Sequence, residues 1–291
     1  MRHALVFGGS GQIGRPLLGR LLRDGWRVTA VSRQPRPEQP GLAWLRGDFG
    51  DLPALPAQVD AIVSCGPLDA FARWYDDSRV GCDRVVAFGS TSVEAKRGSA
   101  DPHERDVAQR LRTGEEGVFA AASQRSARAT LLRPTLVYGA GRDATLTRIA
   151  TLARRWHRFP LPRNASGLRQ PVHVDDLAAA AFAALGSAAT HDRTYALPGG
   201  ETVSYREMVR RVLAVLDPPP TLVELPSPLF NLALAAARFM GGTGLGEAAV
   251  RRMRADLVFD DTPARRDFGY APRAFEPTAR MFEVREETGE T

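Results

Sequence analysis

The sequence predicts an α/β protein of the Rossmann type, a doubly wound parallel sheet with a smaller, mostly helical C-terminal lobe. Short apolar runs alternate with amphipathic helical runs through roughly the first 200 residues, as in repeated β-α units. In addition, a glycine-rich turn follows the first apolar run directly and leads into the first helical run. The later part of the chain is less regular and predicts mostly helices.

Runs of apolar and β-branched residues between turn residues predict seven strands. They cover 4–7, 27–32, 42–45, 61–64, 84–88, 129–132 and 195–197. Helices are expected from residue 13 to a stop at Gly25, and over 104–123, 175–185 and 204–216. Ser204 and Glu207 form a capping-box pattern for the last of these.

The predicted domain boundary lies near residue 200. Residues 1–200 are expected to form the Rossmann domain, with an insertion at about 140–168 that contributes to the substrate lobe. Residues 201–291 are expected to form the C-terminal lobe, with a stiff linker at the three prolines 218–220.

Composition excludes several function classes. The chain has 291 residues, a net charge of +6 and scattered arginines without a basic helix, so we expect no nucleic-acid partner. Two cysteines and isolated histidines predict neither a disulfide framework nor a metal site. Pro228 to Met240 is too short to span a membrane, and no signal peptide precedes the first strand. A cytoplasmic monomer or homodimer is the expectation.

The turn at residues 8–14 predicts a dinucleotide site. Gly8 permits a tight turn, Gly11 lets the backbone approach a pyrophosphate, and Gly14 lets the helix pack on the sheet. The alternative is a tight turn that binds nothing. The residues expected to contact the cofactor here are Gly8, Ser10, Gly11, Gln12, Ile13 and Gly14.

The end of the second strand favours NADP as the cofactor, with NAD as the alternative. Ser32-Arg33 stands where an acidic residue would bind the ribose hydroxyls of NAD, and Arg33 suits a 2′-phosphate. Arg33 is alternatively a solvated loop residue. Asp48 and Phe49 follow the third strand and are candidates for the adenine, although Asp48 also suits a simple turn.

Small residues end the fourth predicted strand. Ser64, Cys65 and Gly66 let the backbone lie along a cofactor, and Cys65 is a small filler rather than a nucleophile because no base accompanies it.

In sum, these residues resemble the extended short-chain dehydrogenase/reductase superfamily, the group of the NAD-dependent epimerases and dehydratases. The resemblance covers most of the chain and rests on the order of its motifs. They are the glycine pattern of 8–14, Asp48-Phe49, 89–93, 133–139 and 167–178. It implies that Ser90 and Pro134 contact the cofactor and that Pro134 lies at its nicotinamide end.

One departure limits what the resemblance implies for mechanism. The family uses a Tyr-x-x-x-Lys pair for acid/base chemistry, but the one lysine of this chain is Lys96, with Ser92 four residues before it. The helix expected over 104–123 contains no tyrosine. The chain is therefore most similar to atypical members of the superfamily.

The catalytic candidates are Thr91, Ser92 and Glu94. Thr91 matches the family's catalytic Ser/Thr, and the alternative is that its hydroxyl satisfies the backbone at a strand end. Glu94 is the first choice for a substitute base because it directly follows the strand tip, although exposed carboxylates are usually only solvated.

Arg169 is the candidate for substrate binding. The resemblance places it where family members hold a diphosphate, and the alternative is an arginine that stabilises a loop or pairs with Asp175. His173 and Tyr138 are expected to be packing residues.

Two functions remain open from the sequence. One is an epimerase/dehydratase-like oxidoreductase that acts on a nucleotide sugar or another anionic metabolite. The other is a non-catalytic NADP-binding protein that acts in sensing or assembly.

Overall fold

The computed structural model describes residues 1–239 and 247–283, and the chain divides into two compact units. The first unit comprises Met1–Thr135, Val174–Leu197 and Asp260–Ala271. The second comprises Leu136–His173, Pro198–Phe259 and the chain from Pro272 onward. The sequence-based boundary near residue 200 differs from this division, because the chain returns to the first unit at Asp260–Ala271.

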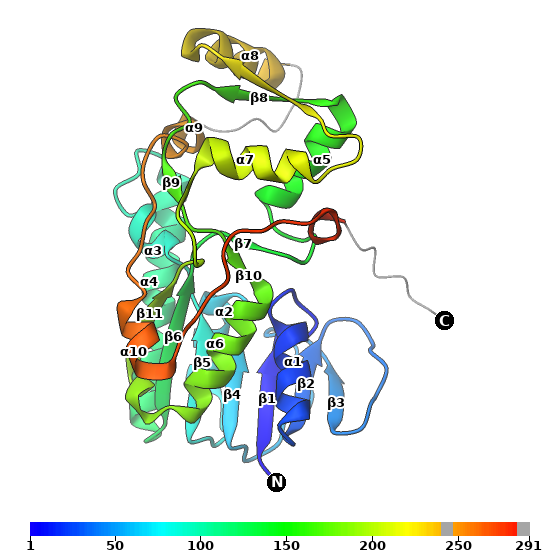
Figure 1. Cartoon of the computed structure of the whole chain (residues 1–291). Coiled ribbons are helices and arrows are strands. Elements are labelled where there is room, and N and C mark those ends of the chain that lie inside the picture. The colour runs from blue at the N-terminus through cyan, green and yellow to red at the C-terminus, as the bar shows by residue number, and fades with distance from the viewer. Residues whose placement is uncertain (240–246, 284–291) are drawn as a thin grey trace. The chain divides into compact units, whose positions relative to one another are not determined.

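A seven-stranded parallel sheet forms the centre of the first unit, in the order β11-β6-β5-β4-β1-β2-β3 (Figure 1). The strand order reverses between β1 and β4, as in a doubly wound Rossmann sheet. The predicted α/β class is thereby confirmed. The strands are β1 (His3–Phe7), β2 (Arg27–Ser32), β3 (Leu42–Arg46), β4 (Ala61–Ser64), β5 (Arg84–Phe88), β6 (Arg128–Pro134) and β11 (Arg193–Leu197).

Helices cover both faces of this sheet. Helix α1 (Gly14–Arg23) packs beside α6 (Val174–Gly186), and α2 (Leu68–Asp77) packs beside α4 (Pro102–Gln124) on the other face (Figure 1). The core beneath α2 and α4 is fully buried. Its largest side chains include Phe7, Phe71, Tyr75, Ile62 and Leu131. Because both faces are covered, the inner strands are almost continuously apolar.

Local sequence signals account for the helix starts. Asp101 accepts a hydrogen bond from the His103 backbone N–H at 2.9 Å, and Pro102 occupies the first turn of α4. In the second unit, Ser204 accepts from the Glu207 backbone N–H at 3.1 Å and begins α7 (Tyr205–Ala214). The cap predicted at Ser204 is therefore present.

The second unit has its own apolar core. Helix α5 (Leu146–Trp156) and α7 contribute half of its buried residues, and Tyr138 and Phe275 are fully buried. Short strands pair around these helices: β7 (Val137–Tyr138) with β10 (Val172–His173), β9 (Leu168–Arg169) with β12 (Val203–Ser204), and β8 (Arg158–Pro162) with β13 (Thr221–Leu225).

The remaining short elements are α3 (Ser92–Ala95), α8 (Ser227–Phe239), α9 (Glu247–Arg252), α10 (Thr262–Phe268), η1 (Ala188–Thr190) and η2 (Ala279–Phe282). Within 1–239 and 247–283, no helix has the length and apolarity needed to cross a bilayer. The same residues contain no group of three or more metal-ligating side chains.

Candidate functional site

The turn between β1 and α1 is shaped by its glycines. Gly8 has φ +70°, and a Cβ there would lie 2.8 Å from the backbone carbon of Cys65. The Gly11 N–H donates to the Gly8 carbonyl at 2.9 Å and closes the turn. A Cβ at Gly14 would collide with the Gly8 carbonyl oxygen. Side chains are thus excluded at Gly8 and Gly14 by backbone atoms that cannot move aside, whereas a Cβ at Gly11 would lie 3.0 Å from the Gly8 carbonyl oxygen.

The N-terminus of α1 is suited to bind an anion. Ile13 precedes the helix and offers no side-chain cap, and the first turn has no acidic residue. The free N–H groups and the helix dipole therefore favour a phosphate.

Two buried polar atoms near the turn find no hydrogen-bond partner among the described residues, the Gln12 Oε1 and the Ser64 Oγ. Gln12 belongs to the turn, and Ser64 ends β4, the strand beside β1. Leaving a buried polar atom unpaired costs about 1–3 kcal/mol, so such atoms usually serve a ligand or a water. The glycine cradle, the helix end and these atoms together fit a dinucleotide.

The ends of β2 and β3 bring the other predicted cofactor residues to the same edge of the sheet. Arg33 is exposed just beyond β2, and Ser32 is buried with its hydroxyl accepting from the Gln34 N–H at 3.3 Å. Asp48 accepts from the Gly50 N–H at 2.9 Å, which is a simple turn contact. Phe49 stacks on Phe7 with ring centroids 4.9 Å apart. Roles for Asp48 and Phe49 at the adenine stay predictions.

Cys65 follows β4 directly, with its N–H donating to the Phe7 carbonyl at 2.9 Å. Burial raises the pKa of the Cys65 thiol to about 12. The thiol is therefore protonated at neutral pH, which agrees with its interpretation as a small filler. A Cβ at Gly66 would lie 3.3 Å from the Phe49 ring, so this glycine leaves space for the aromatic side chain.

The hydroxyl residues after β5 are bonded to the backbone. The Thr91 Oγ1 donates to the Pro134 carbonyl at 3.1 Å, and the Thr91 N–H reaches the same oxygen at 3.1 Å. The Ser90 hydroxyl accepts from the Ser92 N–H at 3.1 Å. These contacts join the tip of β5 to the end of β6. The Thr91 hydroxyl thus bonds a backbone carbonyl, as in the alternative to a catalytic role for this residue.

A cluster of three charged residues lies beside Thr91. Arg133 of β6 donates from Nε to the Glu115 Oε1 at 2.7 Å, makes a second, shorter contact with the other Glu115 oxygen, and reaches Glu94 at 2.7 Å. The hydrogen bond from Arg133 to Glu115 is the main cause that raises the pKa of Arg133. Glu115 is buried and Glu94 is more than half exposed. Glu94 is therefore a carboxylate that is paired with a guanidinium.

Sequence reasoning did not find Arg133 as the centre of this cluster. Glu115 lies on α4 and Glu94 on α3, so their meeting depends on how these elements pack. Helix α4 itself contains neither tyrosine nor lysine, and Lys96 ends α3 instead.

Arg169 belongs to the second unit, and the residue is 5% exposed. Backbone carbonyls surround its guanidinium. It donates to the Leu168 carbonyl at 2.6 Å, to the Ala255 carbonyl at 2.8 Å and to the Arg252 carbonyl. The guanidinium carbon also lies 5.4 Å from the centre of the Tyr205 ring. This geometry favours an arginine that stabilises a loop, and a role in substrate binding stays a prediction.

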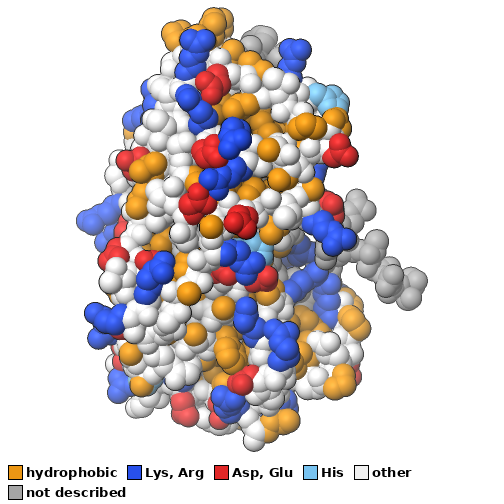
Figure 2. Space-filling model, in the orientation of Figure 1, with side chains coloured by type: hydrophobic (Ala, Val, Ile, Leu, Met, Phe, Trp, Pro, Cys, Tyr) orange, Lys and Arg blue, Asp and Glu red, His pale blue; other side chains and the backbone are white. Residues whose placement is uncertain are grey.

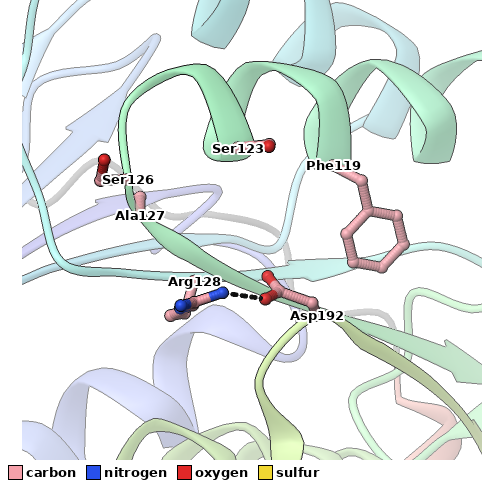
Figure 3. Close-up of a pocket in the computed structure, with 6 residues that line it drawn as sticks. All are labelled: Phe119, Ser123, Ser126, Ala127, Arg128 and Asp192. Atoms are coloured by element: carbon pink, nitrogen blue, oxygen red, sulfur yellow. Dashed lines mark hydrogen bonds and ion pairs between the residues drawn. The ribbon is translucent and has the colours of Figure 1, made fainter.

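A pocket of about 530 Å³ lies at the opposite edge of the sheet, where β6 begins (Figure 3). Its charged residues, Arg128 and Asp192, pair with each other at 2.7 Å. The carboxyl ends of the strands, where ligands bind in open α/β sheets, lie at the other edge. We therefore place the candidate site at the turn of residues 8–14 and not in this pocket.

The fold and the turn define a class: a Rossmann-type protein with a dinucleotide cradle. Residues 4–80 and 78–197 match the model of the NAD-dependent epimerase/dehydratase family. The chain belongs to this family.

Curated relatives include two reductases. The chain is 27% identical to 2-alkyl-3-oxoalkanoate reductase of Stenotrophomonas maltophilia, covering 92% of this chain and 94% of that protein. It is 27% identical to ceramide reductase of Caulobacter vibrioides, covering 77% and 73%. Among solved structures, UDP-glucuronic acid 4-epimerase of Bacillus cereus in complex with NAD aligns with a TM-score of 0.68 at 13% identity, covering 94% of both chains. At this identity the last comparison supports the fold alone.

Proposed function

We propose that the protein binds NADP in preference to NAD and transfers a hydride between this cofactor and a small anionic metabolite. The observation that carries the proposal is the cradle at residues 8–14, where backbone atoms exclude side chains and the α1 N-terminus offers free N–H groups. Arg33, exposed at the end of β2 where NAD-specific proteins carry an acid, supports the preference for NADP.

The bound dinucleotide supplies or accepts the hydride. The backbone of the turn and of α1 binds the pyrophosphate, and the Thr91 and Ser92 region at the β5 tip orients the reacting oxygen. Glu94 exchanges the proton with the reacting oxygen in place of the absent tyrosine, either directly or through a water molecule. Glu94 can leave Arg133 for a substrate without leaving this guanidinium unpaired, because Arg133 retains Glu115 as its buried partner.

For the substrate we favour an oxo acid over a nucleotide sugar. One curated relative, aligned over 92% of this chain and 94% of its own length, is a 2-alkyl-3-oxoalkanoate reductase. Arg169, the residue that would bind a diphosphate, is occupied by three backbone carbonyls, which removes the support for a nucleotide sugar. The reaction class is thus reduction of a ketone, or oxidation of the corresponding alcohol.

The proposal is tested by incubating the purified protein and NADPH or NADH with 3-oxoalkanoates and with UDP-sugars. We expect tighter binding of NADPH, measured by calorimetry, and oxidation of NADPH with the oxo acids, followed by absorbance. Tighter binding of NADH would contradict the cofactor assignment. Turnover of UDP-sugars alone would contradict the substrate class.

A second candidate is a non-catalytic NADP-binding protein. It is favoured by the β5 tip, where Thr91 is bonded to Pro134 and Glu94 to Arg133. Thr91→Val and Thr91→Ser separate the two candidates, since only the serine keeps a hydroxyl. An enzyme loses turnover in Thr91→Val, keeps it in Thr91→Ser, and binds NADPH equally in both; a binding protein shows no turnover in any variant.

A further inference from the structure

The second unit carries an exposed surface that is apolar and basic together. Four of the five large hydrophobic side chains that are exposed in the described residues belong to the second unit, and three of them form this surface: Trp156 is 55% exposed, Leu229 54% and Leu232 68%. Exposed arginines accompany them. We call these residues the Trp156–Leu232 surface, which consists of Arg155, Trp156, Arg158, Arg163, Leu229 and Leu232.

These residues come from elements that adjoin one another around β8. Arg155 and Trp156 end α5, and β8 starts at Arg158. The Arg163 N–H, just beyond β8, donates to the Leu225 carbonyl at 2.9 Å, two residues before α8 begins. Helix α8 then packs on β8. Figure 2 shows hydrophobic atoms over α8 with arginines beside them.

Leu229 and Leu232 lie three residues apart on α8, so they share one face of the helix. Phe230, between them, is buried at 5% exposure. Helix α8 thus packs one side onto the unit and presents leucines to solvent on another. Two exposed leucines on one helix face, together with an exposed tryptophan on an adjoining element of the same unit, are unfavourable in water and usually mark an interaction site.

The charge of this surface has one sign. Residues 151–164 contain four arginines and no acid. In 221–239 the one acid, Glu224, pairs with Arg206 at 3.0 Å. Arg155, Arg158 and Arg163 form no ion pair among the described residues.

We propose that the Trp156–Leu232 surface docks onto the surface of an anionic lipid bilayer. Tryptophan is enriched at the interface of membranes, leucines on one helix face enter the boundary between headgroups and acyl chains, and arginines beside them bind lipid phosphates. A protein partner would need an apolar patch surrounded by acidic groups that matches the shape of this surface. An anionic bilayer supplies an apolar interior and negative headgroups without any such match in shape. This inference does not depend on the cofactor or on the reaction.

Co-flotation of the full chain with lipid vesicles tests the proposal. We expect binding to vesicles of phosphatidylcholine with phosphatidylglycerol, weaker binding to phosphatidylcholine alone, and loss of binding as salt rises. The double variant Arg155→Glu, Arg158→Glu should bind anionic vesicles at least about tenfold more weakly, because each basic residue near an anionic surface contributes to the free energy of vesicle binding. Leu232→Glu should weaken it by a similar factor through loss of insertion.

Matched controls use exposed residues elsewhere. Arg23→Glu with Arg79→Glu makes the same change in net charge in the first unit, and Val258→Glu places an acid at another exposed apolar residue, 48% exposed. We expect all three control substitutions to leave vesicle binding within about twofold, because none lies at the inserted surface. Circular dichroism confirms that each variant is folded.

Three results would overturn the proposal. The first is wild-type protein that does not float with anionic vesicles. The second is equal weakening by the control and surface charge reversals, which would show attraction by net charge alone. The third is a change of oligomeric state in Leu232→Glu with unchanged vesicle binding, which would assign the surface to a second copy of the chain.

Discussion

The end of β1 and the end of β5 belong to one sheet, yet they satisfy their polar groups in opposite ways. At the end of β1 the glycines keep side chains away, and the Gln12 Oε1 and Ser64 Oγ find no partner in the described chain. At the end of β5 the polar groups bond one another, with Thr91 on Pro134 and Glu94 on Arg133.

This difference separates binding from chemistry. The first region is prepared for a ligand, because its backbone amides and buried polar atoms need one. The second region is internally satisfied, and a group there must leave its partner before it can act on a substrate. The turn at residues 8–14 is thus suited to a ligand as it stands, whereas the β5 tip is the region where this chain departs from the standard family motif.

The largest effect is expected from Gly14→Val, which destroys the first region. The new side chain collides with the Gly8 carbonyl, so we expect a loss of about 4 kcal/mol in the free energy of unfolding. Urea denaturation measures it. Gly19→Ala on the same helix is the control: its Cβ meets only the flexible Arg23 side chain, and stability should rise slightly.

Gly11→Ala keeps the fold and is expected to weaken NADPH binding at least about tenfold.

The second-largest effect concerns the two ion pairs of Arg133 near the end of β5. Glu115→Ala leaves the partly buried Arg133 without its main partner and should destabilise the protein by about 3 kcal/mol. Glu94→Gln, which removes the exposed partner, should cost about 0.5 kcal/mol. Equal losses in urea denaturation of the two variants would show that burial does not distinguish the two ion pairs.

A smaller effect is expected at the edge of the cofactor region. Arg33→Ala should lower the preference for NADPH over NADH by about tenfold, or about 1.4 kcal/mol, through loss of the contact with the 2′-phosphate. Calorimetric titration with both cofactors measures the ratio. Arg79→Ala, an exposed arginine distant in sequence, is the control, and an unchanged ratio in Arg33→Ala argues for a solvated loop residue.

The smallest effect concerns Cys65. Because burial raises the pKa of its thiol from 9.0 to about 12, the folded state retains a proton that the unfolded state releases. The corresponding contribution to stability is present below pH 9 and lost as pH rises toward 12. In Cys65→Ala the decline of the urea midpoint across this range should be shallower, with NADPH affinity at pH 7 within about twofold. A strong loss of affinity at pH 7 would assign the thiol a direct role at the cofactor.

Much of the first unit could be predicted from local patterns. The strands at 4–7, 27–32, 61–64 and 84–88 are found as predicted, because strands buried on both faces are continuous apolar runs. The Ser204 cap and the glycine turn are also local signals. Helix α2 was not predicted, although its apolar residues Leu68, Phe71, Ala72 and Tyr75 recur at helical spacing.

The sequence by itself determined the α/β class, the family resemblance and the place of the dinucleotide turn, because each depends on residues adjacent in the chain. Only the tertiary structure decided that Arg133 joins Glu94 to Glu115, that carbonyls of Leu168, Arg252 and Ala255 occupy Arg169, and that 260–271 returns to the first unit. Apart from Leu168, which is the neighbour of Arg169 in the chain, the partners in these side-chain contacts lie 18 to 86 positions apart. Local propensity and periodicity do not encode such pairings, since packing of whole elements brings the partners together.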